Sequence, residues 1–237
     1  MKDAKRLDPP EHSAGDTAHL VANELLSIIP GAAGLFQRFV TPPLEKRQNA
    51  WMQEVATAIK RLEQNIGLTT EELAENEAFA SVVLQATYVA IRNHHEEKKR
   101  ALTNCIFNAG TTSTIAIDLQ LNFVRYIDEL SPFHIQLLRA IKERSAEIAS
   151  LRSYETFYKL IYQNSTNPPT RDVFKMMCLE LQGRGLIRIS QDIEDFEGVF
   201  EASLWLREDT IDDLPRVMIS EVGIQFLEFI SSSDSPS

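Results

Sequence analysis

The densest run of potential metal-ligating side chains is His-His-Glu-Glu at residues 94–97. The run is predicted to lie at a helix start, where adjacent side chains point about 100° apart. Two neighbouring histidines then face different directions, and the sequence has no histidine at the i, i+4 spacing that a shared metal ion needs. We therefore predict no metal site, and we interpret residues 94–97 with Lys98, Lys99 and Arg100 as a solvated, charged helix face.

No other pattern indicates catalysis. Glu71, Glu72, Glu75 and Glu77 form an acidic stretch that a helix N-terminus favours without any acid–base role. The sequence contains no G-x-S-x-G, P-loop or G-x-G-x-x-G motif. We therefore expect a protein that is not an enzyme and that takes no cofactor.

Composition places the chain among ordinary globular proteins. Its 237 residues are 43% hydrophobic and 24% charged, with a formal net charge of −10. An acidic total argues against a general nucleic-acid coat protein, though a local basic patch would remain compatible with it. The two cysteines, Cys105 and Cys178, stand in apolar helical patterns, which predicts buried thiols in a reducing, cytoplasmic setting.

One apolar stretch, residues 18–40, raises the question of a membrane. Its strongest run extends from Leu25 to Phe36 and is interrupted by Pro30-Gly31, so it is shorter than the ~18–20 residues that a span requires. A kinked helix packed in the core is the favoured interpretation. Membrane association is expected only after a trigger.

The rest of the N-terminal half is predicted to be helical. Residues 1–16 and 231–237 are polar and are interpreted as flexible tails, and residues 17–122 as a helical domain. Thr41-Pro42 and Thr69-x-x-Glu72 are helix-start signals, and Gly67 is a helix-stop signal. Apolar residues recur with the helical period in this half, from Trp51 to Ile66 and again from Phe79 to Ile91.

The C-terminal half is predicted to combine helices with short strands. Helices are predicted from Ser131-Pro132, from about Ser153, and from Arg171 to about Gln182 with a stop at Gly183. Strands are predicted at residues 186–190 and 216–220, with a possible strand at 203–206, and a short helix closes the pattern at 223–230.

Three short helices followed by a strand, a loop and a returning strand are the order of a winged helix. The sequence from residue 123 to 230 resembles that family in three pieces: Ser131-Pro132-Phe133-His134-Ile135-Gln136-Leu137-Leu138, Cys178-Leu179-Glu180-Leu181-Gln182-Gly183-Arg184-Gly185-Leu186-Ile187 and Val217-Met218-Ile219-Ser220-Glu221-Val222-Gly223. The resemblance implies a mainly α protein whose second domain, 123–230, is a winged-helix-like α+β unit with a small wing sheet. It also implies DNA binding through the third helix and the wing.

The layout of the whole chain resembles bacterial abortive-infection proteins of the Abi-alpha kind. The similarity lies in the Gly/Pro-broken apolar N-terminus, a long helix, a charged helix, then Phe123-Val124 and Leu130-Ser131-Pro132. It implies a role in phage defence.

The residues of the third predicted helix fit DNA poorly. A helical projection places Val173, Phe174, Met177, Cys178 and Leu181 towards the core, and it centres the opposite face on Asp172 and Leu179 with Lys175 and Met176 beside them. A reading face normally offers Arg, Lys, Asn or Gln to base edges. The predicted wing, residues 191–215, carries nine acids and a single base, Arg207, so phosphate would repel it.

We therefore expect the C-terminal domain to contact protein, as an interaction or sensor-adaptor module with a protein partner or a second copy. The candidate partner-binding residues are Met176, Leu179 and Trp205. The alternative is a winged-helix transcription regulator, whose candidate DNA contacts are Arg171, Lys175, Arg184 and Arg188. A third possibility is a membrane-acting effector that uses residues 18–40.

Overall fold

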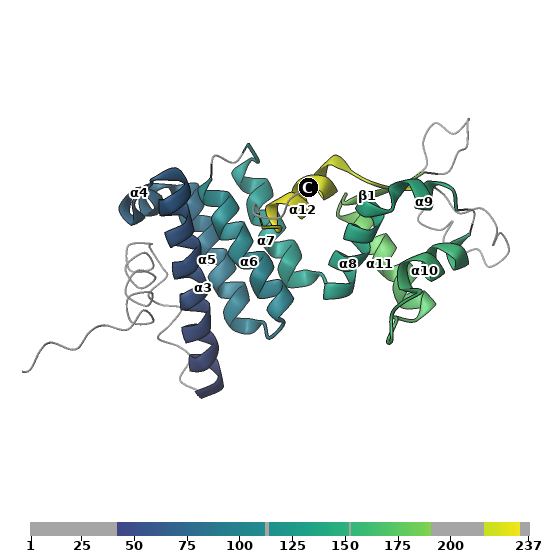
Figure 1. Ribbon diagram of the computed structural model, residues 1–237, viewed down its shortest axis with the longest axis horizontal. Helices are drawn as coiled ribbons and strands as arrows, with labels where there is room; N and C mark the ends of the chain where they lie inside the picture. The colour runs from purple at the N-terminus through teal and green to yellow at the C-terminus, as the bar shows by residue number, and fades with distance from the viewer. Residues whose placement is uncertain (1–41, 112–113, 152, 191–215, 233–237) are drawn as a thin grey trace, which may run out of the picture. The chain divides into compact units, whose positions relative to one another are not determined.

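The computed structural model of the chain describes residues 42–111, 114–151, 153–190 and 216–232. Over these residues the protein is mainly helical, with one small two-stranded antiparallel sheet (Figure 1). The predicted mainly α class with a small sheet is confirmed at this level. The predicted tails, the apolar segment 18–40 and the possible strand 203–206 lie outside the described residues, apart from the first two residues of the C-terminal tail.

The helices are α3 (Pro42–Ile66), α4 (Thr70–Glu75), α5 (Glu77–Arg92), α6 (Glu96–Gly110), α7 (Ile117–Glu129), α8 (Pro132–Glu143), α9 (Ser145–Ala149), α10 (Tyr154–Tyr162), α11 (Arg171–Gly183) and α12 (Glu221–Phe229), and the strands are β1 (Ile187–Ser190) and β2 (Arg216–Ile219). They form two compact units. Unit 1 holds the chain up to Asp128 and again from Phe229, and unit 2 holds Glu129–Glu228. The boundary predicted from the sequence lies at residues 122/123, and the predicted second domain includes the end of the last helix.

Local signals account for the helix ends in unit 1. Thr69 and Glu72 form the predicted capping box, with Thr69 N–H donating to the Glu72 carboxylate at 2.8 Å. Gly67 has φ of +71°, a conformation that glycine adopts without steric cost, and α3 ends immediately before it. Asn76 caps α5 by accepting a hydrogen bond from the Phe79 N–H at 3.1 Å.

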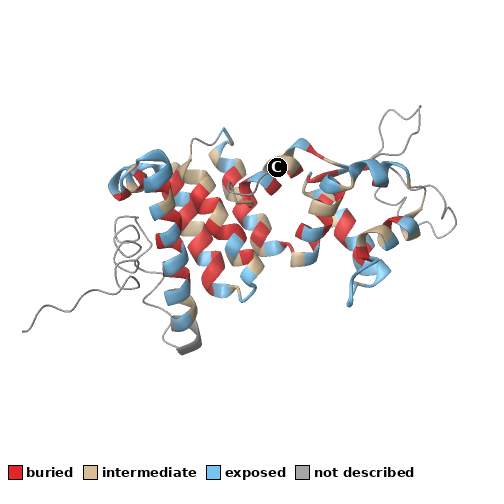
Figure 2. Ribbon diagram, viewed as in Figure 1, coloured by how far each residue is buried: buried red, intermediate tan, exposed pale blue. Residues whose placement is uncertain are grey.

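The core of unit 1 forms where α3, α5 and α6 pack on one another (Figure 2). Its large, fully buried side chains include Trp51, Ile59, Leu62, Phe79 and Leu102. Each such side chain contributes about 1.5–3 kcal/mol by leaving water. The one polar atom of the Trp51 side chain is satisfied, because Nε1 donates to Thr87 Oγ1 at 3.0 Å.

One prediction for α6 is wrong in part. Lys98 was expected on a solvated face, but it is 6% exposed and its Nζ donates to the Asp128 carbonyl oxygen, in the last turn of α7, at 2.8 Å. The apolar stem of lysine allows this burial, and a helix C-terminus offers carbonyls with no intrahelical partner. Burial lowers the pKa of the Lys98 ammonium from its usual value.

The end of α12 is held within unit 1 by two amide side chains of α6. Asn104 Nδ2 donates to the Ile230 carbonyl oxygen at 2.9 Å, and Asn108 Nδ2 donates to the carbonyl oxygens of Phe229 and Ser231 at 2.8 and 3.0 Å. These are carbonyls that a helix leaves unsatisfied at its C-terminus. The residues that follow the last turn of α12 are thereby held by side chains more than a hundred residues earlier in the sequence.

Unit 2 contains α8, α10 and α11 and the β1–β2 hairpin, together with the short helix α9, which sequence analysis did not predict. The strands pair with the register Ile187↔Ile219, Arg188↔Met218 and Ile189↔Val217. Ile187 and Val217 are buried on one face of the hairpin, whereas Arg188 and Met218 are exposed on the other. α8 and α9 pack against β2, and α11 packs against β1.

The start of α12 approaches the start of β1 so closely that only glycine fits. A Cβ on Gly223 would lie 2.1 Å from the Leu186 carbonyl oxygen. The Gly223 N–H donates to Ser220 Oγ at 2.9 Å, and the Ser220 N–H donates to the same Leu186 carbonyl at 3.1 Å. A side chain at position 223 therefore meets fixed backbone at Leu186 and also the Ile219 side chain, whose Cγ1 would lie 2.9 Å away.

We predict that Gly223→Ala lowers the free energy of unfolding by about 1–3 kcal/mol, because the added methyl group forces α12 away from β1. Gly183→Ala is the matched control. It adds the same methyl group at the end of α11 where a Cβ meets nothing within 4 Å, and it should leave stability unchanged or slightly raised. Urea denaturation of both variants measures the difference, and equal midpoints would contradict the close packing.

Candidate protein-interaction surface

Helix α11 is positioned by a cap at its start and an aromatic cluster along its inner face. Thr170 Oγ1 accepts a hydrogen bond from the Val173 N–H at 3.4 Å. The Phe174 ring lies 5.1, 5.5 and 5.8 Å from the ring centroids of Phe157, Tyr158 and Tyr162 in edge-to-face contacts. Phe174, Met177, Cys178 and Leu181 are buried, as predicted.

The opposite side of α11 exposes three apolar side chains at i, i+3 and i+6. Val173, Met176 and Leu179 are 38%, 48% and 37% exposed, and we call them the outer stripe. The predicted exposure of Met176 and Leu179 is confirmed. The predicted burial of Val173 is wrong, because the buried arc of α11 is narrower than the projection assumed and Val173 stands at its edge, 100° from Phe174. The third predicted partner-binding residue, Trp205, lies outside the described residues.

Arg171, the first candidate DNA contact, is engaged by a carboxylate. Its Nε and Nη2 lie 2.5 and 2.7 Å from the two carboxylate oxygens of Glu155, and its guanidinium lies 5.2 Å from the centre of the Tyr158 ring. Lys159 Nζ joins the same carboxylate at 3.2 Å. The hydrogen bond from Arg171 lowers the pKa of Glu155 to about 2, with Lys159 adding to the effect.

Arg184 is likewise bound to acids within unit 2. Its Nη2 lies 3.1 Å from Glu129 Oε2, and its Nη1 lies 3.8 Å from Glu180 Oε2. A guanidinium and the two carboxylates that hold it carry no net positive charge together, so they offer little attraction to a phosphate. The structure therefore places two of the four candidate DNA-contacting residues in internal ion pairs.

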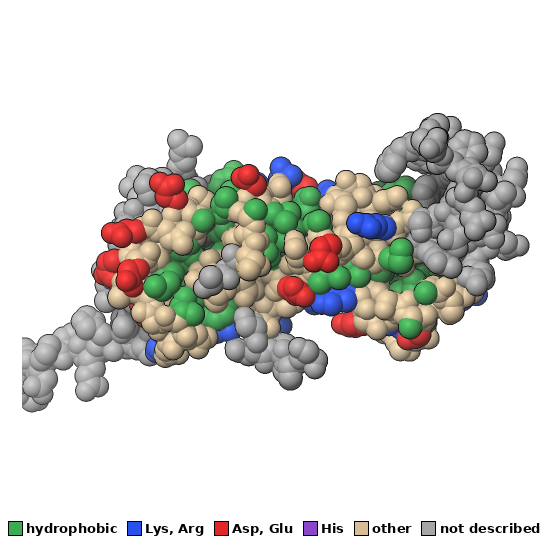
Figure 3. Space-filling model, turned by 90° about the horizontal axis from the view of Figure 1, so that it is seen from above, with side chains coloured by type: hydrophobic (Ala, Val, Ile, Leu, Met, Phe, Trp, Pro, Cys, Tyr) green, Lys and Arg blue, Asp and Glu red, His purple; other side chains and the backbone are tan. Residues whose placement is uncertain are grey.

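Lys175 and Arg188 are the other two candidates, and both are exposed. Lys175 lies on α11, whereas Arg188 stands on the solvent face of the hairpin opposite Met218. On the face of the molecule in Figure 3, the described Lys and Arg side chains do not gather into one continuous basic patch.

A buried polar network, which sequence analysis did not predict, joins α8 to α11. His134 is 5% exposed, its Nδ1 lies 2.7 Å from Ser131 Oγ and accepts from the Ser131 N–H at 3.2 Å, and its Nε2 lies 3.0 Å from Glu180 Oε2. A serine, a histidine and an acid in this order are the parts of a nucleophilic triad. Here the nitrogen that would act as the base also accepts the backbone N–H of the cap, which makes the imidazole a capping and positioning group.

The sequence contains a local signal for the contact between Ser131 and His134 but none for the contact between His134 and Glu180. Ser131-Pro132-x-His134 places a possible acceptor at the third residue of a capped helix, where Glu or Gln is usual. The partner Glu180 is distant in sequence, so no spacing rule could assign it.

The described residues also bear on a metal site and on a membrane span. Among the described residues, no group of three or more His, Cys, Asp and Glu side chains is arranged to hold a metal ion. None of the described helices is both long and apolar enough to cross a bilayer.

Searches with the whole chain found no matching protein-family model, no matching curated protein and no matching solved structure.

The Arg171–Glu155 pair gives a direct prediction. We expect the carboxyl resonance of Glu155 to titrate with a midpoint near pH 2, and Arg171→Gln to move that midpoint up towards the ~4.3 of a free glutamate. The sign follows from linkage: a lowered pKa favours the folded state above the unfolded pKa, and that contribution is lost as the pH falls through about 2. A wild-type midpoint near 4 in the NMR titration would show that Arg171 is not engaged.

Proposed function

We propose that this chain is a non-enzymatic protein-interaction module, a sensor or adaptor, that binds a protein partner through the outer stripe of α11. The observation that carries the proposal is the row formed by Val173, Met176 and Leu179, three apolar side chains exposed side by side on one helix. A protein interface draws its binding energy from a few such anchors. A DNA-reading helix would instead present polar and basic side chains at these positions.

The arrangement of unit 2 supports a winged-helix-like domain. α8, α10 and α11 precede an antiparallel hairpin, and α11 is the helix that leads into β1 through Gly183 and Gly185. In a winged helix this third helix is the one that faces the ligand. The proposed domain therefore keeps the position of a recognition helix and gives it an apolar surface.

Charge separates the proposed protein partner from DNA. Arg171 shares Glu155 with Lys159, and Arg184 is bound by Glu129 and Glu180, so carboxylates engage both arginines. We propose a protein partner with an apolar docking surface, and a second copy of this chain stays the alternative partner.

The regulator alternative keeps some support from Lys175 and Arg188, which are exposed. It predicts salt-sensitive binding to duplex DNA, whereas the adaptor proposal predicts none at physiological salt. The resemblance to abortive-infection proteins suggests phage defence as the setting. A membrane-acting role for residues 18–40 rests on a segment outside the described residues.

We predict that Leu179→Ala and Met176→Ala leave the melting temperature near that of the wild type and weaken partner capture. Truncating a true anchor costs about 2 kcal/mol or more of binding energy, roughly a thirtyfold loss in affinity. A core leucine would instead cost ~2–5 kcal/mol of folding stability. Affinity capture of the tagged, full-length chain from cells, with and without nuclease, followed by calorimetry of the purified variants, measures both quantities.

Met218→Ala is the control, because Met218 is 47% exposed on the hairpin and not on α11. It should retain the partner. Unfolding of the α11 variants would place these side chains in the core. Retention of every partner by folded α11 variants would remove the stripe from the interface, and nuclease-sensitive capture lost with Lys175→Ala or Arg188→Ala would favour the regulator.

A further inference from the structure

Within the described residues, strand β1 has an open edge. The described sheet has two strands only, so β1 pairs with β2 on one side and with no strand of the described chain on the other. α11 packs against β1, as α8 and α9 pack against β2, but none of these helices adds a strand to the sheet. An unpaired strand edge is a template for a further strand, and proteins commonly cover or charge it.

The register identifies which backbone groups face the open edge. The Ser220 N–H donates to the Leu186 carbonyl oxygen at 3.1 Å, and antiparallel pairs alternate between bonded and non-bonded positions. The next bonded pair is therefore Arg188 with Met218. It follows that the N–H and C=O of Ile187 and Ile189 point away from β2, and these groups have no hydrogen-bond partner within the described residues.

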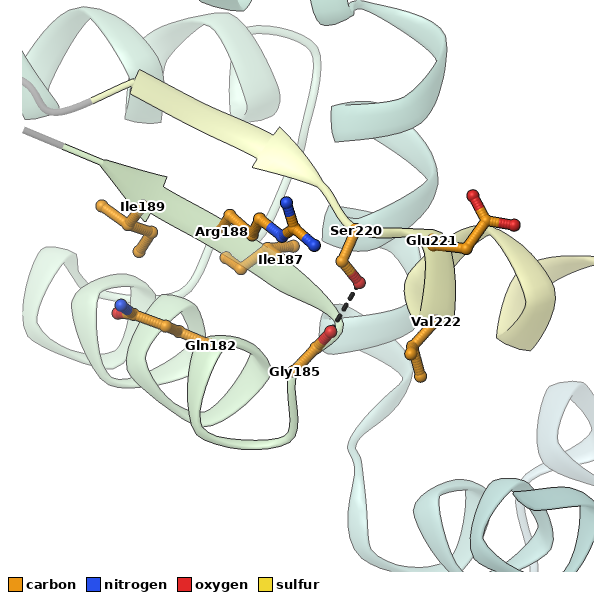
Figure 4. A pocket seen from close by; sticks show the side chains of 8 residues that line it. All are labelled: Gln182, Gly185, Ile187, Arg188, Ile189, Ser220, Glu221 and Val222. Atoms are coloured by element: carbon orange, nitrogen blue, oxygen red, sulfur yellow. Dashed lines mark hydrogen bonds between the residues drawn. The ribbon is translucent and has the colours of Figure 1, made fainter.

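A cavity of about 510 Å³ lies along this edge (Figure 4). Ile187, Arg188 and Ile189 line it from β1, Gln182 from the end of α11, and Val222 from the start of α12. Ser220 and Gly185, joined by a hydrogen bond at the base of the hairpin, close one end. Glu221 lines the cavity as well, so the space is bordered by an apolar wall, one amide, one exposed guanidinium and one carboxylate.

We propose that this cavity binds an extended peptide segment of another protein, which adds to β1 as a third strand. The outward N–H and C=O groups of Ile187 and Ile189 would supply the main-chain hydrogen bonds. The proposal does not depend on the outer stripe of α11. It assigns to unit 2 a second mode of protein recognition, through backbone rather than through exposed side chains.

The two faces of the hairpin determine which side chains are favoured at alternate positions of the bound peptide. Side chains of an added strand alternate between the face of Ile187 and Ile189, which is apolar, and the face of Arg188, which is solvated. A residue beside Arg188 on the same face is favoured when it is acidic. The expected ligand is an extended segment that alternates apolar and acidic residues.

Ile189→Pro is the discriminating variant. Proline at this position removes only the N–H that points out of the edge and leaves the bonds between Arg188 and Met218 intact, which is where edge strands tolerate proline. Ile189→Val is the matched control, because it keeps the N–H and the β-branched side chain. Both should melt near the wild-type temperature.

The experiment is selection of random peptides displayed on phage against the full-length chain, with the recovered peptides then synthesised and titrated. We expect alternating apolar and acidic peptides whose affinity falls about fivefold or more for Ile189→Pro and is kept for Ile189→Val. Peptides N-methylated at the alternate amides that face β1 should lose binding equally, and this comparison stands even if Ile189→Pro fails to fold. Leu179→Ala should not affect these peptides, so failure of the stripe and failure of the edge remain distinguishable.

Recovery of no peptide that binds the wild-type chain would overturn the proposal. So would peptides that bind equally well with and without N-methylation, since these would dock by side chains alone. NMR supplies a second check without a ligand: the amides of Ile187 and Ile189 should exchange faster than those of Arg188 and Met218. The opposite alternation would place the open edge elsewhere.

Discussion

The packing of Phe174 against Phe157, Tyr158 and Tyr162 is the constraint on which the proposed interaction surface of this protein depends. It fixes the rotation of α11 about its axis, because an aromatic side chain buried among three rings cannot move outwards without losing several kcal/mol. With that rotation set, the opposite side of the helix must carry Val173, Met176 and Leu179 into solvent. The helix is buried through one narrow arc and leaves apolar side chains outside it.

The same arrangement governs the charges around α11. Glu155 on α10 accepts hydrogen bonds from Nε and Nη2 of Arg171. Glu180 lies close to both His134 on α8 and Arg184 at the end of α11. These contacts tie three helices together and engage two arginines that the sequence alone leaves available for phosphate. The proposed protein-binding face differs from a nucleic-acid-binding one in its apolar stripe and in these carboxylates.

Much of this architecture follows from local sequence signals. Thr69 with Glu72, Gly67 and Ser131-Pro132 mark helix starts or ends by chemistry that acts within four residues, and the structure begins or ends its helices there. The sidedness of α11 also follows from period alone, which is why Met176 and Leu179 could be assigned to the exposed face. The short helix α9 was not predicted, because five residues are too few to show the helical period of apolar residues.

Features that depend on distant residues could not be predicted. Lys98 is buried because a carbonyl of α7 lies within reach of its ammonium group, and the joint role of His134 and Glu180 exists only once α8 and α11 meet. Val173 was misplaced since a helical projection gives direction but not the width of the neighbour that covers it. The open edge of β1 belongs to the same class, because pairing partners are a property of the sheet and not of the strand.

The most direct test of the outer stripe as a protein-binding surface is photo-crosslinking in living cells, with the photoreactive amino acid benzoylphenylalanine in place of Met176. That side chain is 48% exposed at the centre of the stripe, so a partner docked there lies within reach of the photoreactive group. The structure predicts a discrete protein adduct that resists nuclease and is absent when the same group replaces Lys60, which is exposed on α3. Adducts to nucleic acid, or the same adducts from both positions, would contradict it.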